Sequence, residues 1–159
     1  VEWDGARPTF TSRHQKPIPA SPALAAQVTI WLRSLPAGLL LDAEWLGRRD
    51  GQPESLVVFD VLAIHGRWIG STPAWERFCL LFKAIPFVSL QLNRLAIVEW
   101  SYRNYAAMFE RSKTVPGCEG IVLKRKDSRY IGSARCSVEN GSWLKVKWRS
   151  GLDGQTKVA

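Results

Sequence analysis

The chain has 159 residues, with 22 Lys and Arg against 14 Asp and Glu, which gives a formal net charge of +8. A hydrophobic fraction of 46% suits one globular domain and excludes a disordered or collagen-like chain. No apolar run approaches the roughly 20 residues of a membrane-spanning helix. The three cysteines lack the spacing of a disulfide framework or a zinc site. We therefore expect a monomeric cytoplasmic protein with no membrane partner.

The first part of the chain predicts a short strand followed by a helix. Residues 10–12 favour a strand, and three prolines at residues 17–22 separate it from an apolar segment at residues 23–35. That segment predicts a helix, and the Ser21 hydroxyl is placed to cap its first turn.

Residues 39–46 and 56–64 predict a β-hairpin. The intervening segment, residues 48–53, contains the turn pair Asp-Gly. Within the first strand Asp42 and Glu44 share one face, because side chains alternate along a strand, and the apolar residues share the other face.

The second half of the chain predicts two helices among further strands. Pro73 opens a helix that runs to about residue 85, with Glu76 near its positive end. Residues 102–113 predict a short amphipathic helix. The predicted strands are residues 90–99, 120–126 and 142–148, the last two joined by a polar connection. Helices inserted among antiparallel hairpins predict the α+β fold class.

Positive charge is concentrated near the end of the chain. Residues 124–149 hold eight Lys and Arg against two acids, so this segment carries +6 of the net charge of +8. Such a segment predicts contact with a polyphosphate or an extended polyanion. Charge alone is equally consistent with a solvated basic face.

Two lysines lie on one face of the last predicted strand. Lys145 and Lys147 are two residues apart, so their ammonium groups project from the same side. Like charges at neighbouring strand positions repel, and an anion such as a phosphate is therefore expected between them. Two exposed strand lysines are the alternative interpretation.

Carboxylates occur at two other strand positions. Glu119 precedes Gly120 at the mouth of an apolar strand, a position that suits a hard metal ligand near a phosphate. Asp42 and Glu44 form the second pair. Carboxylates opposite lysines indicate a metal-nucleotide site, and a solvent-facing strand side is the alternative for either pair alone.

The start of the chain adds two guanidinium groups. Asp4-Gly5-Ala6-Arg7 is followed by Thr11-Ser12-Arg13, and arginine suits bidentate contacts with phosphate or ribose. Taken alone, the Asp-Gly pair indicates only a turn.

In their order along the chain these motifs resemble the ordered motifs of a nucleotidyltransferase superfamily, the ATP-dependent DNA ligases, RNA ligases and mRNA capping enzymes. Each motif alone is weak, and the shared order and separations carry the resemblance. The matching segments are residues 3–7, 12–13, 41–44, 58–62, 119–124 and 143–147. The sequence around and between these segments, including His65-Gly66 and Arg129-Tyr130, is most similar to DNA ligases.

The resemblance implies an adenylation domain over residues 1–159, an α+β fold with antiparallel sheets, flanking helices and an ATP cleft between them. It implies that Lys145 and Lys147 hold the α-phosphate of ATP. It further implies that Glu119 and Glu44 bind the ribose or a Mg²⁺ or Mn²⁺ ion.

Further roles follow from the same resemblance. Arg13 would take the 5′-phosphate of nicked or 5′-phosphorylated nucleic acid, most simply DNA. Phe59 would stack on adenine, with a core aromatic as the alternative. The remaining nucleotide contacts implied are Glu2, Asp4 and Arg7.

The family pattern Lys-x-Asp-Gly, whose lysine carries AMP, is altered in this chain. Glu2-Trp3-Asp4-Gly5 puts a carboxylate where the lysine belongs, and a carboxylate cannot form a stable phosphoramidate. A lysine between Glu2 and Trp3 restores the pattern Glu-Lys-x-Asp-Gly that many members share. We hypothesise that this lysine is present and carries AMP, and that as a modified residue it is not written among the standard amino acids of the sequence. The alternative is a catalytically inactive homologue that binds nucleotide or nucleic acid.

Ligases of this family continue past the last motif into an OB-fold domain. This chain ends about a dozen residues after Lys147, and we therefore expect an adenylation domain without a C-terminal OB-fold domain. Weak self-adenylation and salt-dependent DNA binding would follow. An RNA ligase is the nearest rival, and a capping enzyme would use GTP.

Overall fold

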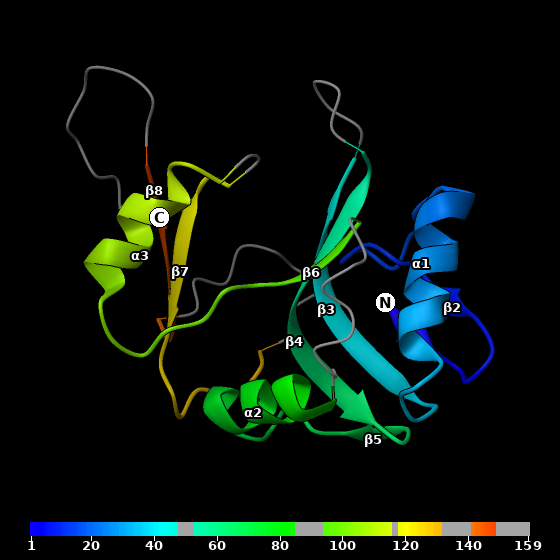
Figure 1. Ribbon diagram of the computed structural model, residues 1–159. Coiled ribbons are helices and arrows are strands. Elements are labelled where there is room, and N and C mark those ends of the chain that lie inside the picture. The colour runs from blue at the N-terminus through cyan, green and yellow to red at the C-terminus, as the bar shows by residue number, and fades with distance from the viewer. Residues whose placement is uncertain (48–52, 85–93, 116–117, 132–140, 149–159) are drawn as a thin grey trace.

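Two β-sheets and three helices make up the described part of the chain (Figure 1). The structure is a computed structural model that describes residues 1–47, 53–84, 94–115, 118–131 and 141–148. No helix within these residues is long and apolar enough to cross a membrane.

The larger sheet has six strands, five of them in the order β2-β1-β3-β4-β5. They are β1 (Glu2–Trp3), β2 (Pro8–Thr9), β3 (Leu39–Leu46), β4 (Ser55–Ile64), β5 (Arg67–Trp68) and, beside this path, β6 (Leu95–Ile97). Neighbouring strands are antiparallel except β6, which runs parallel to β4. The smaller sheet pairs β7 (Gly120–Lys124) with β8 (Trp143–Lys147) in antiparallel fashion.

Helix α1 (Pro22–Leu32) supplies much of the apolar core. Its first turn is capped as predicted, because the Ser21 Oγ accepts the backbone N–H of Leu24 at 3.2 Å. Its buried side chains join one cluster with Trp3 of β1 and the leucines of β3. Strand β1 has only two residues, so burial of the Trp3 side chain, 2% exposed, contributes to holding it against the sheet.

The α+β class and the β3–β4 hairpin predicted from the sequence are confirmed. Helices α2 (Ala74–Ala84) and α3 (Tyr105–Ser112) confirm the two later helices, with shorter bounds for each. Within the strand predicted at residues 90–99, Leu95–Ile97 form β6, and residues 90–93 lie outside the described residues. Residues 48–52 of the turn predicted at residues 48–53, and most of the polar connection before β8, lie outside the described residues.

The strand predicted at residues 10–12 is wrong. Strand β2 lies earlier, and Thr11 makes only an isolated bridge with Pro17. The Ser12 Oγ accepts the backbone N–H groups of His14 and Lys16 at 3.3 and 3.2 Å. These local hydrogen bonds close a loop where the composition favoured an extended segment.

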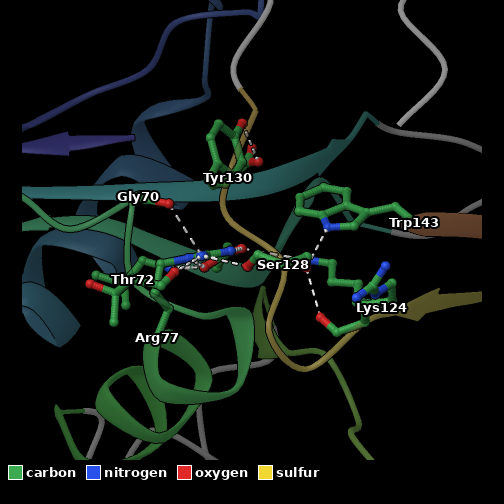
Figure 2. Close-up of polar contacts among 11 residues, drawn as sticks. Gly70, Thr72, Arg77, Lys124, Ser128, Tyr130 and Trp143 are labelled. Carbon is green, nitrogen blue, oxygen red and sulfur yellow. Dashed lines mark hydrogen bonds and ion pairs between the residues drawn. The ribbon is translucent and has the colours of Figure 1, made fainter. Parts of the chain in front are cut away.

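A buried ion pair joins helix α2 to the larger sheet. The Arg77 guanidinium is 0% exposed and donates from Nε and Nη2 to the two carboxylate oxygens of Asp60 on β4, each at 2.9 Å. Its Nη1 also donates to the backbone carbonyl oxygens of Gly70, Thr72 and Ser128 (Figure 2). The pair is therefore bidentate and further satisfied by backbone acceptors, the geometry in which a buried charge is tolerated.

Substituting Arg77→Leu should remove this bidentate partner and leave the buried Asp60 carboxylate with one cation, the Lys124 ammonium 3.4 Å away. We expect the free energy of unfolding, measured by urea denaturation, to fall by about 3–5 kcal/mol. The matched control is Arg111→Leu on helix α3, because Arg111 pairs with Glu99 at an exposed position. Exposed pairs contribute about 0–1 kcal/mol, so equal losses in the two variants would contradict the assignment.

Candidate functional site

Lys145 and Lys147 lie side by side on β8, as the sequence predicted. In the β7–β8 register Lys145 is opposite Val122 and Lys147 is opposite Gly120. The Glu119 Oε2 lies 2.6 Å from the Lys147 Nζ and 3.8 Å from the Lys145 Nζ. In this structure the anion expected between the two ammonium groups is therefore the carboxylate of Glu119.

Gly120 makes that contact possible. Strict alternation would direct the side chains of residues 119 and 120 to opposite faces of the strand. Gly120 instead has a φ of +143°, and a Cβ added there would lie 2.0 Å from the backbone oxygen of Val146. Only glycine fits this conformation and this close approach, so the backbone can direct Glu119 toward the lysines.

Lys124 lies at the other end of β7 and reaches the larger sheet. Its Nζ is 3.4 Å from the Asp60 Oδ2, 4.0 Å from the ring centroid of Trp143 and 5.3 Å from that of Phe59. Burial lowers the pKa of Lys124, and the Asp60 charge opposes this effect. The structure thus places Lys124 against Asp60.

A register shift in the sheet brings Phe59 to the same place. Asp42 pairs with Asp60 and Ala43 with Val58, so Phe59 is the extra residue on β4. Neighbouring strand residues normally face opposite sides, and a bulge re-aims one of them. The shift explains how Phe59 and Asp60, adjacent in sequence, both lie next to Lys124.

Asp42 and Tyr130 form a second polar contact on this face. The Tyr130 hydroxyl donates to the Asp42 Oδ2 at 2.8 Å (Figure 2). Burial raises the pKa of Asp42, and the charge of Asp60 raises it further, while the Tyr130 hydrogen bond opposes the shift. Burial and the Asp42 charge also raise the pKa of Tyr130. As predicted, Asp42 lies on the face of β3 away from its buried leucines.

The turn at the start of the chain has the structural role that its Asp-Gly pair indicates. The Asp4 Oδ1 accepts the backbone N–H groups of Ala6 and Arg7 at 2.7 and 2.8 Å, and these hydrogen bonds lower the pKa of Asp4. The Arg7 side chain is 86% exposed, with its Nε 4.0 Å from the Asp4 Oδ2.

Glu2 projects from the exposed side of β1. Its Cα is paired with that of Leu40, two residues before Asp42 on the neighbouring strand. Positions two apart share a face, so the residue preceding Trp3 lies on the same face as Asp42.

Two predicted site residues stand apart from these contacts. The Arg13 Nε donates to the His14 Nε2 at 3.3 Å at an exposed position. Glu44 is exposed on β3, opposite Val57. Within the described ranges Glu44 and Glu119 do not join any group of three His, Cys, Asp or Glu residues that could hold a metal. The metal site predicted at Glu119 and Glu44 stays a prediction.

Sequence reasoning missed Arg77 as a residue that organises this region. A signal was present, because Arg77 occupies the buried stripe of helix α2 together with Ala74 and Leu81, spaced at i, i+3 and i+7. An arginine on an apolar helical stripe requires a buried carboxylate partner, and Asp60 supplies it.

A family model described as the ATP dependent DNA ligase domain matches residues 48–147. The chain belongs to the ATP-dependent DNA ligase domain family. The matched range contains Phe59, Lys124 and the Glu119–Lys145–Lys147 group, and it confirms the resemblance drawn from the motifs. These side chains therefore lie on a nucleotidyltransferase fold.

Similar proteins carry DNA ligase names. The chain is 34% identical over 107 residues to a probable DNA ligase of Anaeromyxobacter sp., which covers 67% of this chain and 19% of that protein. It is 34% identical over 95 residues to a probable DNA ligase of Streptomyces coelicolor, with 60% and 18% covered. The match thus spans about a fifth of the length of these relatives.

Solved structures show the same arrangement of the chain. A mycobacterial DNA ligase D complexed with ATP and MES has a TM-score of 0.67 at 27% identity, over 92% of this chain and 50% of that one. The ligase domain of Mycobacterium tuberculosis LigD has a TM-score of 0.66 at 26% identity, over 91% and 48%.

Substituting Asp42→Asn should alter the pH dependence of stability. A folded-state pKa raised above the ordinary value of 3.8 means that the folded chain binds more protons than the unfolded chain just above that pH. Asp42 therefore contributes less to stability as the pH rises through its raised pKa. We expect the free energy of unfolding of the wild type to fall relative to Asp42→Asn between about pH 4 and 7.

Urea titrations at several pH values measure this difference. Glu44→Gln, which changes an exposed carboxylate on the same strand, is the control and should alter the pH dependence less. A difference between wild type and Asp42→Asn that stays constant across the range would contradict the burial of Asp42.

Proposed function

We propose that this chain is the nucleotide-binding part of an ATP-dependent DNA ligase that carries AMP on a lysine and transfers it to a 5′-phosphate before a nick is sealed. The observation that carries the proposal is the placement of Lys145 and Lys147 on one exposed face in a member of this family. A similar structure that contains ATP, the mycobacterial DNA ligase D, supports ATP as the nucleotide.

The two β8 lysines would hold the α-phosphate. Their side chains are 58% and 54% exposed, and that of Glu119 is 63% exposed. Exposed ion pairs contribute little to stability, so a phosphate can replace the Glu119 carboxylate at small cost. Lysine ammonium groups would then stabilise the charge that develops on the phosphate oxygens during in-line transfer.

Lys124 has a different task from the β8 lysines. Its side chain is 21% exposed and lies between the Asp60 carboxylate and the rings of Phe59 and Trp143. Releasing it for a phosphate would leave Asp60 with fewer partners, which is costly for a buried charge. We infer that Lys124 fixes the Phe59 ring, and that this ring stacks on adenine.

The nucleophile would occupy the strand position before Trp3. The buried Trp3 ring fixes the direction of β1, so the preceding side chain projects from the exposed face shared with Asp42. In the first step the neutral amine of a lysine there attacks the α-phosphorus, an N–P bond forms, and pyrophosphate leaves while the amine loses a proton. In the second step a 5′-phosphate oxygen displaces the lysine, and the 3′-hydroxyl then displaces AMP.

Several assignments stay predictions within this proposal. Arg7 and Asp4 for the nucleotide, Arg13 for the 5′-phosphate, and a Mg²⁺ or Mn²⁺ ion at Glu119 and Glu44 are of this kind. Such an ion would need the phosphates of the nucleotide for part of its coordination, as Mg²⁺ commonly does. A monomeric state and a cytoplasmic location are also predictions.

Peptide mass spectrometry of the protein from its source tests the lysine hypothesis directly. We expect the peptide that spans residues 1–7 to contain one additional lysine between Glu2 and Trp3, bare or carrying AMP. Glu2 joined directly to Trp3 would reject the covalent mechanism for this chain and leave a homologue that binds without reacting.

Transfer of label from ATP tests the roles of the lysines. A variant with lysine inserted between Glu2 and Trp3, incubated with ATP labelled at the α-phosphate, should become covalently labelled. Adding Lys147→Ala should reduce the labelling rate by roughly 100-fold, the usual cost of losing one group that stabilises transition-state charge.

Lys113→Ala is the matched control for that experiment. Lys113 is also an exposed lysine that pairs with a glutamate, Glu110, and its loss should leave labelling unchanged. Equal labelling of the Lys147→Ala variant would reject its proposed role. ATP binding without labelling of the lysine-inserted protein would favour the non-catalytic homologue, the second candidate function, which the Glu2 side chain itself favours.

A further inference from the structure

Five aromatic side chains form a cluster outside the motif residues. They are Trp75, Phe78 and Phe82 on helix α2, and Trp100 and Tyr102 on the segment between β6 and α3. Trp100 is central, since its ring centroid lies 4.6 Å from that of Trp75 and 4.7 Å from that of Phe78. We call this set the aromatic surface.

The rings of the aromatic surface are partly open to solvent. Trp75 is 37% exposed, Tyr102 49% and Phe82 51%. Contiguous apolar patches of this kind are uncommon on soluble proteins unless they bind something. Burial of the core therefore does not account for the position of these side chains.

Cations lie over the same rings. The Lys126 Nζ is 5.7 Å from the ring centroid of Trp75 and 5.2 Å from that of Tyr102, and the Arg103 Cζ is 5.2 Å from the Tyr102 ring. The backbone fixes this arrangement, because the Trp75 N–H donates to the Lys126 carbonyl oxygen at 3.1 Å. The aromatic surface is thus an ordered set of rings with positive charge at its edge.

We propose that the aromatic surface binds single-stranded DNA by stacking unpaired bases on Trp75 and Tyr102, with Lys126 and Arg103 meeting the phosphates. Aromatic rings interleaved with cations are the usual chemistry for single-stranded nucleic acid, because every base offers a face for stacking and every nucleotide a phosphate. The net charge of +8 favours a polyanion as the occupant.

The location of the surface suits a strand that enters the nucleotide site. Lys126 follows Lys124 by two residues, and Glu119 marks the opposite end of β7, about 16 Å away by strand geometry. Figure 1 shows α2 and the segment leading to α3 beside the end of the smaller sheet that holds Lys124. The choice of DNA rests on the proposed function, whereas the stacking chemistry rests on the rings and cations alone.

Fluorescence anisotropy of a labelled 20-residue oligothymidylate without a 5′-phosphate tests this proposal. The double variant Trp75→Ala/Tyr102→Ala should bind it about 5- to 100-fold more weakly, which corresponds to the loss of stacking for one base or more. Trp75→Phe/Tyr102→Phe keeps the rings and should restore most of the affinity. Lys126→Ala should lower the slope of log affinity against log salt by about 0.7.

Trp68→Ala is the matched control, because Trp68 is 51% exposed on β5 of the larger sheet and should not affect binding. Circular dichroism and urea midpoints establish that each variant is folded. Absence of binding by the wild type, or equal losses for Trp68→Ala, would overturn the proposal. So would a loss of self-association in the double variant with unchanged oligonucleotide binding, which would make the surface a protein contact.

The same probe separates this proposal from the proposed function. An oligonucleotide without a 5′-phosphate and without a template cannot be adenylated or joined. If oligonucleotide binding depends on the rings but the lysine-inserted protein takes up no AMP from labelled ATP, the aromatic surface is kept and ligation by this chain is rejected. AMP transfer without ring-dependent binding would do the reverse.

Discussion

The rest of the structure depends on the ion pairs that the buried Asp60 carboxylate makes with Arg77 and Lys124. Asp60 is 3% exposed, and its carboxylate accepts two hydrogen bonds from Arg77 of α2. The Lys124 Nζ, on β7, lies 3.4 Å from the Asp60 Oδ2. The two cations balance the negative charge of the Asp60 carboxylate, which would be costly to bury without a partner. Because the three residues come from β4, α2 and β7, this contact fixes the smaller sheet against the larger one.

That constraint sorts the lysines by function. A ligand phosphate competes with whatever carboxylate already pairs with each lysine, and burial decides the cost of the exchange. The Glu119 pairs are more than half exposed on both sides, so solvent screens them and they yield readily. The Asp60 pairs are buried and do not. In the proposed function, Lys145 and Lys147 are therefore the cations that a reacting phosphate would engage, whereas Lys124 stays paired with the buried Asp60.

Strand alternation predicted much of this arrangement, and local breaks in alternation account for what it missed. It placed Lys145 beside Lys147, and it set Asp42 apart from the buried leucines. It could not place Phe59, because a register shift between Val58 and Asp60 re-aims that ring. It gave no route from Glu119 to the lysines, since that route depends on the φ of Gly120. The helical stripe could mark Arg77 as buried, but its partner Asp60 lies 17 residues away in sequence, so no local pattern could name it.

The same face of the larger sheet bears on the residue that precedes Trp3. Glu2 and Asp42 project from one side of the sheet, separated by about 7 Å along the strand direction, with Asp60 paired to Asp42 on the next strand. Burial and the charge of Asp60 raise the pKa of the Asp42 carboxyl, and the charge of Lys124 opposes the shift. A cation at the position before Trp3 would act in the same direction as Lys124 and favour the charged form of Asp42. This face of the sheet therefore suits the lysine that the proposed function places before Trp3.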